Sequence, residues 1–336
     1  MKRLTGMKQP LPLPLKIVGI GRYLPKRIVS SKELENRCGL PEGWCERKQG
    51  VRERRWVEDE TVSFMAAEAA KEAIANAGTQ SRDIDLIINT SQAFEQAFPE
   101  GGTLVQQQLQ LGDSGIPCMS VTAACLGFIV ALDLCASLLA GGHYRNILVV
   151  TSETPSISLD FSNPNVCTMM GDGAAAAVVT RTPPGETNGI HAALMETYSE
   201  AAKVSSISRN TARNTFFNKN IAPGNFGFDF DPQPMQKTAM KYNRKFLAKL
   251  WPSSNIDAIK LVIPNQASRF ALDMMKFVFP PQKIIGIIDH LGNCGAVGYP
   301  MALYEAIKKN QIKRGDMVLM TGMGAGFSII GIVLTY

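Results

Sequence analysis

The chain has 336 residues, of which 45% are hydrophobic, so it is long enough to bury one large core or two similar ones. Its net charge of +6 is modest and spread along the chain, so it favours acidic partners only weakly and does not imply nucleic-acid binding. No apolar run reaches the ~18 residues of a membrane span, and residues 1–15 lack the apolar core of a signal peptide. The seven cysteines form no CxxC pair, which predicts a protein of the reducing cytoplasm without a zinc or disulfide framework.

In chain order, predicted strands alternate with predicted helices. The pair Gly19 and Gly21 lacks the third glycine of a dinucleotide-binding fingerprint, so a turn is expected there. Several strands are continuous apolar runs, typical of a sheet that is covered on both faces. The elements expected in the first half are a strand at 16–25, a short helix from 31, a helix at 61–77 stopped by Gly78, a strand at 84–89, a helix at 102–111, a strand at 117–121, a helix at 126–140 and a strand at 146–151.

The second half of the chain repeats this order. Residues 256–263 echo the strand at 84–89, and residues 316–321 echo the strand at 146–151, at nearly the same separation along the chain. An apolar helix and a glycine-containing break precede the last strand in each half. Two copies of a β-α-β-α-β unit are therefore predicted, with an N-terminal half at 1–182 and a C-terminal half at 183–336. Chance similarity between ordinary α/β segments is the weaker alternative.

The expected helix at 126–140 is apolar nearly all round, so it is predicted to run through the core. Cys125 lies at its first turn among small residues, which leaves room for another molecule to approach. The positive end of a helix favours a thiolate, so Cys125 is predicted to be a nucleophile with a lowered pKa. The alternative is an inert, packed cysteine. Under the duplication, Cys125 and Asn293 occupy corresponding positions and would meet across a pseudo-twofold axis.

Six short motifs in the chain resemble those of a known family. They are Gly50-Val-Arg-Glu-Arg54, Thr122-Ala-Ala-Cys-Leu-Gly-Phe128, Met170-Gly-Asp-Gly-Ala174, Pro264-Asn-Gln-Ala267, Asp289-His-Leu-Gly-Asn293 and Gly324-Ala-Gly-Phe327. From about Lys16 to its C-terminus, the chain resembles the β-ketoacyl-acyl-carrier-protein synthase III proteins of the thiolase superfamily. The resemblance implies a thiolase-like five-layer αβαβα fold, a homodimer and Claisen chemistry on thioesters.

The resemblance also assigns roles to single residues. Cys125 would accept the acyl group, and the backbone amides of Cys125 and Ala325 would form the oxyanion hole. Asn293 matches its motif, but Asn265 stands where the family has its catalytic histidine. The expected catalytic set is therefore Cys125, Asn265 and Asn293.

The chain has only three histidines that could supply a displaced imidazole. His143 and His191 are expected at the surface, the latter in a polar loop. His290 is the sole candidate, although the resemblance gives its position to another side chain of the motif.

The resemblance further implies a binding site for the substrate. Trp44 would stack on the adenine of coenzyme A, Lys48 stands where an arginine is usual, and Ser268 replaces an asparagine that touches the pantetheine arm. Phe98 would cross the dimer interface to the partner's acyl pocket, with ordinary interface packing as the alternative. Acyl-coenzyme A or acyl-carrier-protein thioesters are the expected substrates. No permanently bound cofactor or metal is expected.

Basic residues recur at helical spacing in the segment 234–250, with Met240, Leu247 and Leu250 expected to face inward. The simpler interpretation is a solvated basic face, and the functional one is docking of an acidic acyl carrier protein. The residues concerned are Lys237, Lys241, Arg244, Lys245 and Lys249.

Three functions remain open on the sequence. The first is a ketosynthase III-like acyltransferase that loads an acyl group on Cys125 and condenses it with a malonyl-type thioester, in fatty-acid or polyketide biosynthesis. The second is an acyltransferase to an oxygen, nitrogen or sulfur nucleophile, without decarboxylation. The third is a structural subunit in a hetero-oligomer with a complete ketosynthase. Retention of Cys125 argues against the third.

Overall fold

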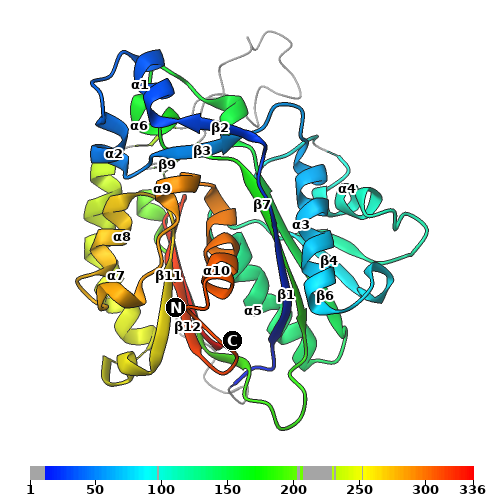
Figure 1. Cartoon of the computed structure of the whole chain (residues 1–336). Coiled ribbons are helices and arrows are strands. Elements are labelled where there is room, and N and C mark those ends of the chain that lie inside the picture. The colour runs from blue at the N-terminus through cyan, green and yellow to red at the C-terminus, as the bar shows by residue number, and fades with distance from the viewer. Residues whose placement is uncertain (1–11, 97, 203–204, 207–228, 231, 252) are drawn as a thin grey trace.

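The computed structural model describes residues 12–96, 98–202, 205–206, 229–230, 232–251 and 253–336 (Figure 1). Most of the N-terminal segment that was searched for a signal peptide lies outside the described residues. No helix within the described ranges has both the length and the apolar character that crossing a bilayer requires.

The strands form two main sheets with the same internal order. In the first sheet the order is β1 (Lys16–Tyr23), β7 (Gly173–Thr180), β6 (Asn146–Glu153), β4 (Leu86–Asn89) and β5 (Cys118–Ser120). In the second it is β8 (Gly189–Thr197), β13 (Ser328–Thr335), β12 (Met317–Gly324) and β11 (Ile259–Pro264). Two short pairs join β2 (Arg27–Ser30) to β3 (Glu53–Trp56), and β9 (Ser205–Ser206) to β10 (Asp229–Phe230).

Strand directions also match between the two sheets. β4 runs parallel to β6, and β7 is antiparallel to both β6 and β1. In the same way β11 runs parallel to β12, and β13 is antiparallel to both β12 and β8. Ile284 makes a parallel bridge to Val262 on the far side of β11, the place that β5 occupies beside β4. The repeated order and directions agree with a duplicated unit. The predicted boundary at 182/183 falls between β7 and β8 and stays a prediction.

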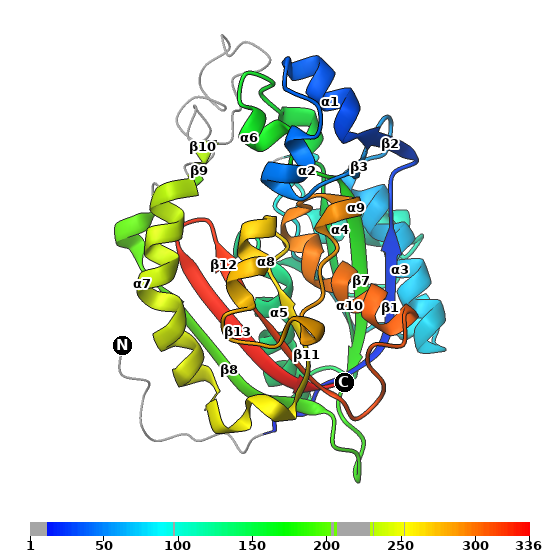
Figure 2. The same cartoon turned by 60° about the vertical axis from the view of Figure 1, so that its left-hand side comes forward.

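Helices and sheets alternate in five layers (Figures 1 and 2). The helices α3 (Val62–Ala77) and α4 (Gly101–Gln108) cover the outer face of the first sheet. Between the sheets lie α5 (Gly127–Ala140) and α10 (Gly298–Lys308). The outer face of the second sheet is covered by α7 (Pro232–Leu250) and α8 (Arg269–Met275). The α/β, five-layer prediction is confirmed.

Short helices connect these elements. The α-helices are α1 (Ser31–Cys38), α2 (Trp44–Gln49), α6 (Pro164–Cys167) and α9 (Ile288–Leu291). The 3-10 turns are Ser81–Asp83, Pro155–Ser158, Ser199–Ala201, Ser253–Ala258, Pro281–Lys283 and Gly295–Val297. The strand expected at 256–263 begins only at Ile259, because its first residues complete one of these turns.

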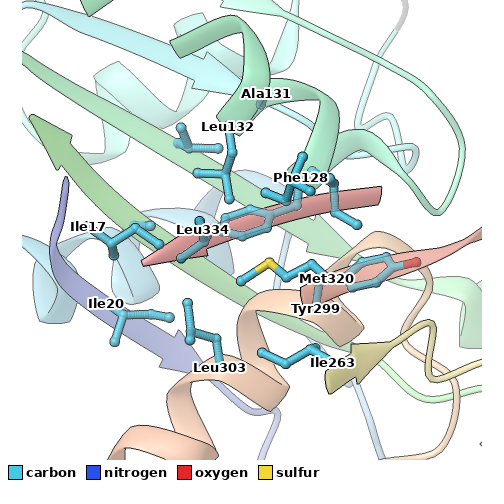
Figure 3. Packing of buried hydrophobic residues seen from close by; sticks show 14 of the residues in the cluster. Ile17, Ile20, Phe128, Ala131, Leu132, Ile263, Tyr299, Leu303, Met320 and Leu334 are labelled. Atoms are coloured by element: carbon cyan, nitrogen blue, oxygen red, sulfur yellow. The ribbon is translucent and has the colours of Figure 1, made fainter. Parts of the chain in front are cut away.

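The central layer is buried and apolar, as the apolar character of α5 predicted. Figure 3 shows Phe128 and Leu132 of α5 among side chains of β1, β12, β13 and α10. Both side chains are completely buried. Each such side chain stabilises the fold by roughly 1.5–3 kcal/mol, and Leu132→Ala would cost about 2–5 kcal/mol.

The glycines of β1 have a packing role instead of the predicted turn. Gly19 and Gly21 lie inside the strand, and a Cβ there would sit 2.1 Å and 2.2 Å from the carbonyl oxygens of Ala73 and Ala69. Glycine therefore lets α3 lie directly on β1. The ends of α3 are as predicted: the Thr61 hydroxyl accepts from the Phe64 amide, and Gly78 follows in the left-handed region.

Candidate active site

Cys125 lies in a tight turn directly before α5. The preceding residue, Ala124, has φ +49°, a conformation that costs a non-glycine residue about 1 kcal/mol or more. A Cβ on Gly127 would lie 2.9 Å from the Thr90 carbonyl oxygen, so glycine lets the start of α5 approach the end of β4. The turn holds the half-buried Cys125 side chain at the mouth of the central layer.

The turn between β12 and β13 lies against this cysteine turn. A Cβ on Gly324 would meet the Leu126 side chain at 2.9 Å and the Ala123 carbonyl oxygen at 3.6 Å. Gly326 has φ +78° and reverses the chain. Gly324, the residue before Ala325, therefore packs against the residues on either side of the Ala124–Cys125 turn, and the role of Ala325 as an oxyanion-hole donor stays a prediction.

Asn265 follows β11 and is fixed against β12. Its backbone amide donates to the Thr321 carbonyl (3.1 Å), and its side-chain Nδ2 donates to the Met323 carbonyl (2.7 Å). Its side-chain oxygen is buried and has no partner among the described residues. An amide nitrogen carries two hydrogens, so one donor remains after the bond to Met323.

Asn293 is held in a tight turn after α9. Its side-chain oxygen accepts from the Gly295 amide (2.9 Å), and its Nδ2 donates to the Ala267 carbonyl (3.3 Å). Because Ala267 follows Asn265 by two residues, this bond ties the two asparagine segments together. The structure thus brings the predicted Asn265 and Asn293 into one region.

Glu153, at the end of β6, is a buried acid that sequence reasoning missed. Its carboxylate accepts from the backbone amides of Gln92 (2.7 Å) and Ala93 (3.1 Å), and it packs against Gly295. Burial raises the pKa of Glu153 to about 8. The available signal was a polar end, Ser152-Glu153, on a strand that is otherwise apolar.

The predicted lowering of the Cys125 pKa is wrong for the free protein. Burial of the thiol, followed by the effect of the Glu153 carboxylate, raises the pKa of Cys125 to about 11, and a hydrogen bond from Asn265 opposes the rise only partly. The physical reason is that α5 begins at Gly127, so Cys125 lies outside the helix, while the atoms packed around the half-buried residue partly desolvate its thiol. Cys135, deep in α5, is fully buried and its pKa is raised further.

Two of the motifs named in the sequence contribute a buried charged residue, Arg54 in one and Asp172 in the other, whose bonds fix the surrounding backbone. Arg54 is completely buried and donates to the carbonyls of Val29 and Thr168 and to the Ser31 hydroxyl. Asp172 accepts from the Val57 amide and from Ser156. Both side chains have structural partners.

None of the three histidines lies beside Asn265 as a free imidazole. His290 has both ring nitrogens engaged, by Asp289 (2.7 Å) and by Glu305 (2.8 Å), and these partners raise its pKa. His143 is exposed, as expected, and follows the end of α5 that is opposite Cys125. His191 is not in a polar loop as predicted; it lies in β8, half-buried, with its Nε2 2.7 Å from the Thr335 hydroxyl.

Three of the four predicted substrate-binding residues lie on two helices that contact each other, and the fourth does not. Trp44, half-buried, and Lys48, exposed, belong to α2, which contacts α8. Ser268 is the N-cap of α8, where its hydroxyl accepts from the Ala271 amide (3.2 Å). Phe98 lies apart from these elements, before α4, and is 81% exposed.

The basic helix α7 is divided into paired and unpaired residues. Lys241 forms an ion pair with Glu200 (2.9 Å) and Lys249 with Glu196 (2.7 Å). The exposed basic residues for which no such pair is described are Lys237, Arg244 and Lys245. The expectation that Met240 faces inward is wrong, because it is 67% exposed; Leu247 and Leu250 are buried as predicted. Among the described residues, no cluster of His, Cys, Asp or Glu could hold a metal ion.

Comparisons with known proteins place this site in a family. A family model described as 3-oxoacyl-[acyl-carrier-protein (ACP)] synthase III matches residues 119–199, and the model of its C-terminal part matches residues 253–336. The β-ketoacyl-[acyl-carrier-protein] synthase III of Aquifex aeolicus is 32% identical over 96% of this chain and 99% of its own length. That of Rhizorhabdus wittichii is 31% identical over 93% of this chain and 96% of its own length.

Solved structures give the same result. The crystal structure of the Aquifex aeolicus synthase III matches with a TM-score of 0.83 at 31% identity, covering 96% of this chain and 100% of that one. A crystal structure of a Xanthomonas campestris OleA variant shares the fold, with a TM-score of 0.82 at 22% identity, over 96% of this chain and 98% of that one. With its two duplicated sheets, its cysteine turn and its full-length likeness to these proteins, the chain belongs to the β-ketoacyl-[acyl-carrier-protein] synthase III family.

Proposed function

We propose that the protein is a ketosynthase III-type acyltransferase whose nucleophile is Cys125 and whose second-step donors are Asn265 and Asn293. The observation that carries the proposal is the convergence of three turns. The cysteine turn packs against Gly324, Asn265 is bonded to Met323 just before that glycine, and Asn293 is bonded to Ala267. These contacts support a site in which a thiol, backbone amides and two side-chain amides face one region.

In the first step, the Cys125 sulfur attacks the carbonyl carbon of an acyl thioester. The backbone amides of Cys125 and Ala325 stabilise the tetrahedral oxyanion. The carbon–sulfur bond of the donor then breaks, and the proton of the Cys125 thiol leaves on the departing thiol. The acyl group remains as a thioester on Cys125.

In the second step, a malonyl-type thioester loses carbon dioxide, and its enolate carbon attacks the carbonyl carbon of the acyl group. The bond between that carbon and the Cys125 sulfur breaks, and the sulfur leaves as a thiolate that takes a proton from solvent. The enolate oxygen needs hydrogen-bond donors. We propose that Asn265 stands in the place of the family's histidine and supplies one donor, while Asn293 supplies the other. Neither amide can act as a general base, so this step is expected to be slow.

Because the second step lacks a general base, we also propose an alternative function. An acyltransferase that passes the acyl group to an oxygen, nitrogen or sulfur nucleophile needs Cys125 and the backbone amides but no enolate. The observation in its favour is that the described part of the chain holds no free imidazole near Asn265. A purely structural subunit is disfavoured, because the strained turn at Ala124 retains a cysteine where an inert residue would serve.

The substrates and partners follow the family. Acyl-coenzyme A or acyl-carrier-protein thioesters would enter past Trp44, Lys48 and Ser268, without a permanently bound cofactor. We propose a homodimer, supported by the exposed apolar side chains Phe94 (69%) and Phe98 (81%) near the edge strand β5. The seven free thiols are compatible with a reducing cytoplasm.

Intact-mass spectrometry after incubation with acyl thioesters of graded chain length tests the proposal. An adduct of one acyl group is expected on the unmodified protein and none on Cys125→Ala. Cys135→Ala is the matched control, because this buried thiol lies in the same segment and should leave the adduct unchanged. Absence of an adduct with every donor would favour the structural subunit, and carbon dioxide release from a malonyl thioester separates the two enzymatic functions.

A further inference from the structure

Tyr299, in α10, carries a polar group for which the fold provides no partner. Its side chain is completely buried, and its hydroxyl makes no hydrogen bond to any described residue. Tyr304, on the same helix, shows the ordinary arrangement, since its hydroxyl donates to Glu72 (2.7 Å). A buried hydroxyl without a hydrogen bond destabilises the folded protein, so its retention calls for an explanation.

The hydroxyl of Tyr299 is aimed at the active site. Figure 3 shows the ring among apolar side chains, with its oxygen at the end away from Ile17 and Ile20. A Cβ on Gly322 would lie 2.0 Å from this oxygen and 2.7 Å from the Cβ of Asn265. Glycine at position 322 therefore makes the room in which the hydroxyl comes to lie beside Asn265.

Two further observations connect this hydroxyl to the chemistry. Asn265, whose Cβ and backbone nitrogen lie beside Gly322, also carries a buried side-chain oxygen without a partner among the described residues. Cys125 is also close enough to Tyr299 for a charge on its sulfur to raise the tyrosine pKa, after the larger effect of burial. A neutral hydroxyl therefore remains at physiological pH, able to donate a hydrogen bond.

We propose that the Tyr299 hydroxyl is a catalytic hydrogen-bond donor, which donates to the Cys125 sulfur while that sulfur carries negative charge. The inference rests on the proposed function only in taking Cys125 as the nucleophile. In the resting thiol the bond is not made, because a neutral sulfur is a weak acceptor; such contacts commonly tighten only during reaction. Tyr299 keeps its own proton throughout, so the balance of the acylation step is unchanged.

This role of Tyr299 would compensate for the low thiolate fraction of Cys125. The Cys125 pKa of about 11 leaves only a small thiolate fraction at neutral pH, and no described histidine is placed beside it to accept the proton. One hydrogen bond to a charged group changes an equilibrium by roughly tenfold or more. Tyr299 would therefore raise the reactive fraction by about that factor.

The test compares Tyr299→Phe with the unmodified protein in the rate of Cys125 alkylation by iodoacetamide between about pH 7 and 9.5, followed by peptide mapping. The reagent needs no acyl donor, so the outcome does not depend on the substrate or on condensation. The expected profile of Tyr299→Phe runs parallel to that of the unmodified protein but roughly tenfold lower. Tyr304→Phe is the matched control and should leave the profile unchanged.

Thermal unfolding supplies the second measurement. Tyr299→Phe removes an unpartnered oxygen, so its Tm should be equal to or above that of the unmodified protein, whereas Tyr304→Phe should lose stability with its bond to Glu72. Superimposed alkylation profiles would overturn the inference. So would a fall in the Tm of Tyr299→Phe as large as that of the control, because the hydroxyl would then have a structural partner.

Discussion

The side-chain amide of Asn293 donates to the carbonyl of Ala267, and this 3.3 Å bond joins the two segments that supply amides to the candidate site. Asn265 lies two residues earlier and is fixed to β12 by its own bonds to Thr321 and Met323. Exchange of the Asn265 side chain leaves its backbone bond to Thr321 in place, whereas exchange of the Asn293 side chain removes the bond that joins the two segments.

The Glu153 carboxyl should control the reactivity of Cys125. Because the pKa of Glu153 is about 8, this group is mostly neutral at pH 6.5 and mostly charged at pH 9.5. Its charge raises the Cys125 pKa, so Glu153→Gln should speed alkylation of Cys125 at pH 9.5 by roughly threefold, equivalent to about half a pKa unit.

The comparison at pH 6.5 is the internal control for Glu153→Gln. There the rates of the variant and the unmodified protein should agree, because both side chains are uncharged. A constant ratio at the two pH values would mean that the substitution acts by disturbing the Gln92–Ala93 backbone, not through charge.

His290 should contribute to stability and not to catalysis. Its raised pKa means that its ion pairs are fully present below the ordinary value of 6.5 and are lost as pH rises through the higher folded value. The pKa of Glu305, lowered to about 2, gives a contribution that is present above 4.5 and is lost as pH falls toward 2. His290→Gln should therefore lower the Tm by roughly 2 °C at pH 6 and by less at pH 9.

Acylation of Cys125 by a thioester is the second measurement for His290→Gln. It should remain within about twofold of the unmodified rate, since both ring nitrogens of His290 are already engaged by Asp289 and Glu305 and are not available to the sulfur. A loss of about a hundredfold with an unchanged Tm would instead make His290 a catalytic group.

Local sequence signals predicted the elements that depend on local physics. The helix expected at 61–77 with its glycine stop and the all-round apolar helix expected at 126–140 required no knowledge of distant contacts. Predictions that depended on the tertiary environment of a residue were less accurate. The helix-end argument for Cys125 ignored desolvation, which only the packed structure reveals.

The missed residues share the same cause. Glu153 and Tyr299 stand in segments that look like ordinary strand and helix, and their importance comes from what tertiary packing places around them. Gly19 was expected in a turn because glycine often marks one, whereas here the glycine permits the close approach of α3. Which buried polar groups meet in the folded protein cannot be predicted from the spacing of residues along a single sequence.

The basic residues of α7 that have no ion pair within the described part of the chain should matter for a carrier protein more than the paired ones. Arg244→Gln/Lys245→Gln removes two exposed charges, whereas Lys241→Gln/Lys249→Gln removes charges already engaged by Glu200 and Glu196. At about 0.15 M salt, where long-range attraction is screened, only direct contacts should count. The first pair should lower kcat/KM for carrier-bound substrate by roughly tenfold and the second by less.

A short thiol analogue of the substrate is the control for both α7 variants. It lacks the acidic protein surface, so neither pair should change its kcat/KM. Equal losses with the analogue and with carrier-bound substrate would show that the substitutions damage the enzyme itself, and the basic face would then have no docking role.

The identity of residue 265 should decide how fast malonyl thioesters are decarboxylated. An asparagine donates a hydrogen bond to the enolate oxygen but can neither become cationic nor take up a proton. Loss or misplacement of one oxyanion donor costs on the order of 10²–10³ in rate, so a histidine in this position should recover part of that range. We expect Asn265→His to raise carbon dioxide release from a malonyl thioester by about tenfold or more.

Acylation of Cys125 separates this effect from a general improvement of the site. The first step depends on the thiol and on backbone amides, so its rate in Asn265→His should change by less than about threefold. Asn265→Ala provides the opposite comparison, because it removes the donor and should lower decarboxylation while leaving the backbone bond to Thr321. If the unmodified protein releases carbon dioxide as fast as the histidine variant, two neutral amides suffice for the enolate, and the chemistry of this site was never limited by the missing imidazole.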